Sequence, residues 1–192
     1  MYDLIKSQLR TSSNIKQQLS ENEAVVKLIH DISDQCIQAF RNGNKVLLAG
    51  NGGSASDAQH IAAEFVGRFE KDRAGLPALA LATNSSTVTA VGNDYGYDAI
   101  FQRQVQALAV PGDVFFGFTT SGNSNNVVAA VQECRAKGIT SVGMTGESGG
   151  SLLELCDYCV RVPSSNTARI QEAHITIGHI ICYLVENTLF KD

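Results

Sequence analysis

Two residues able to bind a metal or transfer protons, His60 and Glu64, lie four positions apart in a segment with helical periodicity. Residues at this spacing share one face of a helix, one turn apart, so both side chains could reach one ion. Asp57 and Arg68 extend the same polar stripe. A solvated pair is the commoner explanation for a His and a Glu at this spacing, so the spacing alone leaves both explanations open.

A second pair of polar residues, Gln171 and His179, lies in the last apolar segment of the chain. Eight residues of helix separate them by about 12 Å along the axis. His179 is embedded among isoleucines, where a core histidine with a satisfied hydrogen bond is the usual explanation. The residues alone therefore leave its role undecided.

Two loops rich in glycine and hydroxyl groups are candidate anion sites. Residues 50–57 read GNGGSASD, in which Ser54 is a plausible helix N-cap, and residues 119–124 read TTSGNS. Backbone N–H groups at a helix start attract anions. Helix capping alone also enriches such turns in these residues, but two loops at corresponding places favour phosphate binding. The first loop lacks the lysine of a Walker motif, and no acid follows the second strand to support a dinucleotide site.

These groups must be positioned by alternating strands and helices. Short apolar runs predict five strands at 46–49, 78–82, 114–118, 141–144 and 158–162, separated by helical segments near 54–70, 85–109 and 124–137. Residues 3–42 and 168–190 are also predicted to be helical. Crossovers of this length predict parallel strands with helices on both faces, and ligands then bind beyond the carboxyl ends of the strands.

Composition narrows the class of protein. The 192 residues suit one globular domain, and a net charge of −4 offers no basic surface for nucleic acid. We expect no membrane span and no signal peptide, and hence a cytoplasmic protein. The five cysteines are odd in number and scattered, which indicates reduced thiols rather than disulfides.

Four motifs, GNGGSASDAQH, VGNDYGYD, TTSGNS and RIQEAHITIGH, occur in this order along the chain. Together they resemble the motifs of the phosphoheptose isomerases, members of the sugar isomerase (SIS) fold group. The resemblance covers essentially the whole chain. It implies a single domain, 1–192, that forms a three-layer α/β/α sandwich. The sheet would have five parallel strands in flavodoxin-like order, with an added N-terminal helix. It also implies a homotetramer that uses residues 1–42 for assembly.

The resemblance further implies an aldose–ketose isomerase that interconverts sedoheptulose 7-phosphate and D-glycero-D-manno-heptose 7-phosphate in bacterial heptose biosynthesis. One Zn²⁺ per subunit would be held by His60, Glu64, Gln171 and His179, a donor set that suits zinc. Glu64 is then expected to be the base and His179 the acid. Because a straight helix holds Gln171 and His179 far apart, we hypothesise that each active site is completed across a subunit interface.

Other residues match the substrate site of the resembling family. Asn93 and Asp94 would contact sugar hydroxyls, and the second loop, helped by Ser54, would hold the phosphate. The full expected set is Asn51, Gly52, Gly53, Ser54, Glu64, Asn93, Asp94, Thr119, Thr120, Ser121, Ser124 and Gln171. The chain departs from the family pattern at Ala168, where some members carry an acid, and at Thr119, where serine is common.

Two other functions are weighed against this one. A non-catalytic SIS-domain protein, such as a partner of a replication initiator, would keep the phosphate loops but lack the groups at Glu64 and His179, which this chain retains. An isomerase of another sugar phosphate would share the same loops. The segment RIQEAH followed by His179 favours the heptose branch.

Overall fold

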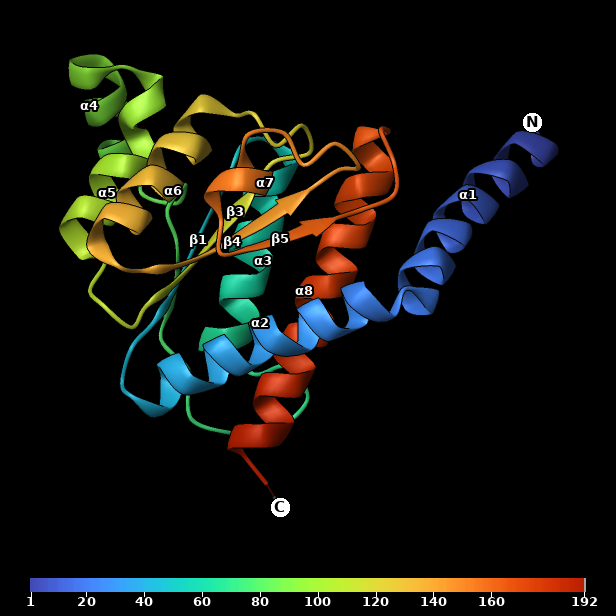
Figure 1. Cartoon of the computed structure of the whole chain (residues 1–192), viewed down its shortest axis with the longest axis horizontal. Helices are drawn as coiled ribbons and strands as arrows, with labels where there is room; N and C mark the ends of the chain where they lie inside the picture. Colours follow the sequence, from blue (N-terminus) through green and yellow to red (C-terminus); the bar gives the residue numbers. More distant parts are fainter. Residues whose placement is uncertain (192) are drawn as a thin grey trace.

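The sheet predicted from the sequence is present. The computed structural model describes residues 1–191, and Figure 1 shows a central sheet with helices on both sides. All strand pairs are parallel, in the order β2-β1-β3-β4-β5, which is the flavodoxin-like order. The strands are β1 (Val46–Gly50), β2 (Ala78–Ala80), β3 (Val114–Phe118), β4 (Thr140–Thr145) and β5 (Tyr158–Arg161).

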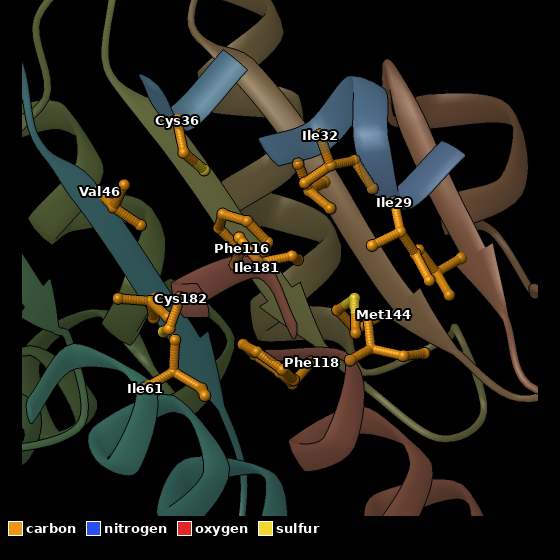
Figure 2. Packing of buried hydrophobic residues seen from close by; sticks show 14 of the residues in the cluster. Ile29, Ile32, Cys36, Val46, Ile61, Phe116, Phe118, Met144, Ile181 and Cys182 are labelled. Carbon is orange, nitrogen blue, oxygen red and sulfur yellow. The ribbon is translucent and has the colours of Figure 1, made fainter. Parts of the chain in front are cut away.

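Alternate residues of the strands belong to two hydrophobic clusters, one on each face of the sheet. Val46 and Leu48 of β1 belong to one cluster, whereas Leu47 and Ala49 belong to the other, as the two-residue period of a strand requires. The first cluster packs α2 (Glu23–Arg41), α3 (Gly53–Val66) and α8 (Thr167–Leu189) on the sheet, and Figure 2 shows side chains from these helices meeting Phe116, Phe118 and Met144. The second packs α5 (Ile100–Leu108) and α6 (Asn125–Lys137). The predicted three-layer sandwich is confirmed.

The N-terminal segment is helical as predicted, but it forms two helices rather than one. α1 (Tyr2–Glu21) ends at Asn22, whose backbone is extended and whose side chain accepts hydrogen bonds from the N–H groups of Ala24 and Val25 at the start of α2. Asn22 is therefore a helix N-cap. α2 packs on the sheet, whereas α1 projects away from the domain and buries only Ile15 and Leu19 (Figure 1).

Four further details differ from the prediction. The helix predicted over 85–109 is divided into α4 (Ser85–Tyr95), a 3-10 turn at Tyr97–Ala99 and α5, because Gly96 has a φ of 87°. β2 ends at Ala80, and a short helix, α7 (Leu152–Leu155), was not predicted. Ser54 is not an N-cap. It lies inside α3, which begins after Gly52.

No helix among residues 1–191 has the length and apolar content that a membrane crossing needs.

Candidate active site

The two candidate anion loops meet where the strand order reverses. β1 and β3 are neighbours in the sheet, and the strands that follow them in sequence, β2 and β4, lie on opposite sides of this pair. At such a switch point a crevice opens beyond the carboxyl ends of the strands. Asn51, after β1, and Asn126, in the first turn of α6, face each other across it. Each amide nitrogen donates to the other amide oxygen at 2.9 Å. The loops are thus joined by a reciprocal amide pair.

The first loop needs glycine for close packing. A β-carbon at Gly50 would come within 2.6 Å of the Ser54 carbonyl oxygen, and one at Gly53 within 2.5 Å of the Gln171 side-chain nitrogen. The Gln171 amide therefore lies directly over Gly53, at the first turn of α3. Gly52 and Gly53 are exposed, whereas Ser54 is buried, so the backbone of the glycines is the accessible part of this loop.

The second loop gathers hydroxyl groups at the start of α6. The Thr119 hydroxyl lies 2.9 Å from the Ser124 hydroxyl and 3.4 Å from that of Ser121, and the Asn123 N–H donates to the Ser121 hydroxyl at 3.1 Å. Thr120 follows Thr119 at the end of β3 and is partly exposed. Hydroxyls and N–H groups converging on a helix start form an anion site. The hydroxyl groups of this loop therefore lie close together, and phosphate binding by them stays a prediction.

The segment with Asn93 and Asp94 is tied to both loops. These two side chains are exposed and hydrogen-bonded to each other at 2.8 Å. The Tyr97 hydroxyl donates to the Asn51 side-chain oxygen at 3.1 Å, and Asn125 donates to Asp98 at 3.2 Å. Sequence reasoning did not assign Tyr97, Asp98 or Asn126. Tyr97 and Asp98 lie within the VGNDYGYD motif, which could have pointed to them. Asn126 could not be singled out in this way, because strand-to-helix turns are often rich in Asn.

A cluster of three potential metal ligands lies between α3 and α8. His60 Nε2 is 3.0 Å from Glu64 Oε1, and the rings of His60 and His179 have centroids 4.9 Å apart. One ligand atom from each of the three residues lies within 4.8 Å of the other two. The Nε2 atom of His179 is buried and has no hydrogen-bond partner. An orphaned imidazole nitrogen beside a second imidazole and a carboxylate fits a zinc ion.

The cluster exists because α3 and α8 run side by side in the same direction. Gly53 meets Gln171 at one end of the contact, and Ile61 meets Gly178 at the other. Three of the four predicted ligands therefore come together within one chain. The fourth, Gln171, lies against the first turn of α3, seven residues before His60, and so faces the anion loops.

The electrostatics of the cluster favour neutral imidazole at His179. Burial and the nearby His60 lower the pKa of His179, and only the Glu64 carboxylate opposes them. The Phe69 ring adds an apolar wall, with its centroid 5.6 Å from that of the imidazole. Neutral imidazole is the form that binds metals. On α3, burial raises the pKa of Asp57 to about 6, although the nearby His60 has the opposite effect.

The chain matches the SIS domain family over residues 9–146. It is 55% identical to a phosphoheptose isomerase of Aneurinibacillus thermoaerophilus over 192 residues, which are all of this chain and 97% of that protein. It is 56% identical to phosphoheptose isomerase 2 of Campylobacter jejuni over 97% of this chain and 92% of that protein.

Solved structures of phosphoheptose isomerases have the same fold as this chain. A phosphoheptose isomerase from Francisella tularensis superposes with a TM-score of 0.92 at 38% identity, over 97% of this chain and 98% of that one. The phosphoheptose isomerase of Neisseria gonorrhoeae superposes with a TM-score of 0.90 at 38% identity, over 97% of this chain and 98% of that one. Because sequence identity extends over nearly the whole chain and the fold is shared, the chain belongs to the phosphoheptose isomerase family.

Proposed function

We propose that this protein interconverts sedoheptulose 7-phosphate and D-glycero-D-manno-heptose 7-phosphate by aldose–ketose isomerisation in heptose biosynthesis. One observation carries the proposal: a carboxylate and an imidazole from helices far apart in the sequence converge within 4.8 Å. The two anion loops lie at the same edge of the sheet. A phosphate held there would leave the sugar to extend toward the pair.

The reaction requires one proton to leave C1 of the ketose and one to arrive at C2, through an enediolate. We assign the first transfer to the Glu64 carboxylate, as base, and the second to His179, as acid. Because its surroundings favour the neutral imidazole, His179 must gain the proton that it donates during turnover. Phe69 lies against the imidazole, and such an apolar wall excludes water and strengthens electrostatic interactions in the site. Asn93 and Asp94 would bind sugar hydroxyls, and their exposure leaves them free to do so.

The phosphate is assigned to the second loop. Thr119, Thr120, Ser121 and Ser124 would offer hydroxyl and N–H donors, and the N–H groups at Gly52, Gly53 and Ser54 would help from the first loop. Asn51 is engaged on both sides by Asn126 and Tyr97, so its side chain would shape the crevice while its backbone faces the ligand.

We further propose that one Zn²⁺ per subunit is held by His60, Glu64 and His179. Gln171, which lies apart from these three in the single chain, would become the fourth ligand when the site is completed across a subunit interface. A bound zinc would supply a positive charge that stabilises the enediolate oxygen. Glu64 is expected to serve both as ligand and as base, and a carboxylate committed to a metal is a poor base. Glu64 must therefore either change its coordination during turnover or act as base in a metal-poor state.

Assembly into a homotetramer with active sites at subunit interfaces is also proposed, with residues 1–42 as the assembly segment. The exposed apolar residues Leu4, Ile5 and Leu9 on α1 support it, since such residues tend to become buried in an interface. An interface could bring a group toward Gln171, which lies apart from the three clustered ligands. The predicted cytoplasmic location is consistent with five free cysteines.

NMR of sedoheptulose 7-phosphate incubated with the protein tests the function. Wild type should form the aldose, and Glu64→Gln and His179→Gln should form none. Glu154→Gln and His30→Gln, which change exposed residues of the same types, are matched controls that should retain activity. Aldose formation by both site variants would overturn the assigned roles.

The rival functions are separated by the same assay. Arabinose and hexulose phosphates offered in parallel should be converted at least about tenfold more slowly, the scale expected from misplacing the reacting carbons of a bound sugar. Equal conversion of a different sugar phosphate would reassign the substrate. Binding of sugar phosphates without any conversion would favour the non-catalytic SIS-domain alternative.

A further inference from the structure

A buried ion pair lies next to the proposed active site. Arg73 Nε donates to Glu186 Oε1 at 2.9 Å, and the side chains are only 3% and 1% exposed. Glu186 belongs to α8, and Arg73 to the loop that follows α3. Buried ion pairs add little net stability compared with apolar residues of the same size. The pair therefore calls for an explanation beyond stability.

The guanidinium caps the end of the helix that carries Glu64. Arg73 Nη2 donates to the Glu64 carbonyl oxygen at 2.9 Å, and Nη1 donates to the carbonyl oxygens of Phe65 at 2.6 Å and Gly67 at 3.0 Å. The last carbonyls of a helix lack partners within it and carry partial negative charge. One cation thus fixes the final turn of α3, including the backbone of the proposed base.

The carboxylate holds the loop against the helix that carries His179. Glu186 accepts hydrogen bonds from three successive N–H groups, those of Phe69 at 3.1 Å, Glu70 at 2.7 Å and Lys71 at 3.0 Å. Burial alone would raise the pKa of Glu186, but these donors and Arg73 outweigh it and lower the pKa. The Phe69 ring then stands 5.6 Å from the imidazole of His179. Glu186 and His179 lie two turns apart on α8, hence on one side of it.

We propose that Arg73 and Glu186 are positioning residues of this isomerase, which set the placement of Glu64 on α3, and of the Phe69 ring, relative to His179 on α8. Neither side chain contacts the reacting atoms. They act through the Glu64 carbonyl and the Phe69 N–H group. The inference rests on the roles proposed for Glu64 and His179.

The main test variant is the double substitution Arg73→Met with Glu186→Leu. It removes both charges together, whereas a single substitution would leave an unpaired buried charge. In the folded variant, kcat for sedoheptulose 7-phosphate should fall about tenfold to 100-fold, as should the affinity for Zn²⁺ measured by calorimetry. KM should change less than about threefold, because the anion loops are untouched.

Lys45→Met is the matched control. Lys45 pairs with the buried Asp113 at 2.6 Å, at the amino ends of β1 and β3, the opposite edge of the sheet from the site. This variant should unfold at lower denaturant concentration than wild type but keep its kcat and Zn²⁺ affinity. Loss of kcat and Zn²⁺ affinity in the control as large as in the double variant would show that general destabilisation is responsible and would overturn the inference.

Arg73→Lys provides a second variant should the double variant not fold. Lysine keeps a positive charge near Glu186 but lacks the planar fork that reaches several carbonyls, so we expect an intermediate loss of kcat and Zn²⁺ affinity. Unchanged kcat and Zn²⁺ affinity in either folded variant would overturn the inference. An inactive wild type would instead contradict the proposed function, and the two failures are thereby distinguished.

Discussion

Gly178 on α8 lies so close to Ile61 on α3 that a β-carbon at residue 178 would come within 2.5 Å of the Ile61 Cδ1 atom. Each residue is next in sequence to a member of the candidate metal cluster, His179 and His60. The closeness of the two imidazoles therefore depends on a glycine at this crossing.

Gly178→Ala should push the two helices apart. Ile61 is buried and β-branched, so it has little room to move. We expect a loss of about 1–3 kcal/mol in the free energy of unfolding, the usual cost of overpacking, measured by urea denaturation. Gly92→Ala, whose β-carbon would lie an ordinary 3.8 Å from Ile100, is the matched control and should be neutral or stabilising by about 0.4–1 kcal/mol. Equal stability of the two variants would contradict the steric argument.

Metal removal should abolish activity. After dialysis against a strong chelator, the protein should lose conversion of sedoheptulose 7-phosphate and regain it with one equivalent of Zn²⁺, measured by elemental analysis alongside NMR. His60→Ala removes one of the clustered imidazoles and should weaken Zn²⁺ binding at least about tenfold. His30→Ala, on the exposed side of α2, should bind as wild type does. Full activity without any bound metal would rule out the zinc proposal.

Sequence patterns predicted the sheet and its helices well, because buried parallel strands are short and wholly apolar. Val114–Phe118 is an example, with every residue buried. The division of the N-terminal segment was missed, although Asn22 is a favoured N-cap residue. Helical periodicity continues on both sides of it, and nothing local requires the chain to change direction there.

The site was predicted only as far as local spacing and family motifs allow. His60 and Glu64 share a helix face by spacing alone. Their approach to His179 depends on the contact of Ile61 with Gly178, which is a tertiary feature. The Arg73–Glu186 pair joins residues distant in the sequence, and nothing in the residues near either partner marks it.

Asn126→Asp should weaken substrate binding. The carboxylate cannot donate to the Asn51 side-chain oxygen, so one half of the amide pair is lost. It also places a negative charge beside the loops proposed to bind phosphate. We expect KM for sedoheptulose 7-phosphate to rise about tenfold, equivalent to about 1.4 kcal/mol, with a smaller change in kcat. Asn187→Asp, which adds the same charge near the end of α8, should leave KM unchanged, and an unchanged KM for Asn126→Asp would argue against phosphate binding at these loops.

His174 should make the protein sensitive to acid. Its side chain is fully buried beside Phe118, and Nε2 donates to the Thr145 carbonyl oxygen at 3.1 Å while Nδ1 has no partner. Burial lowers the pKa of His174 from 6.5 to about 4, although the bond to Thr145 opposes this. In the unfolded chain His174 therefore binds a proton as the pH falls through about 6.5, whereas in the folded chain it binds one only near pH 4.

Folding stability linked to His174 is thus complete above about pH 6.5 and is lost as the pH falls toward 4, by up to about 1.4 kcal/mol per pH unit. His174→Gln should flatten this part of the profile, measured by urea unfolding at intervals between pH 7.5 and 4.5, even if its stability at pH 7.5 is lower. His30→Gln, an exposed histidine, should keep the wild-type slope. The same slope in His174→Gln as in wild type would show that other groups cause the acid sensitivity.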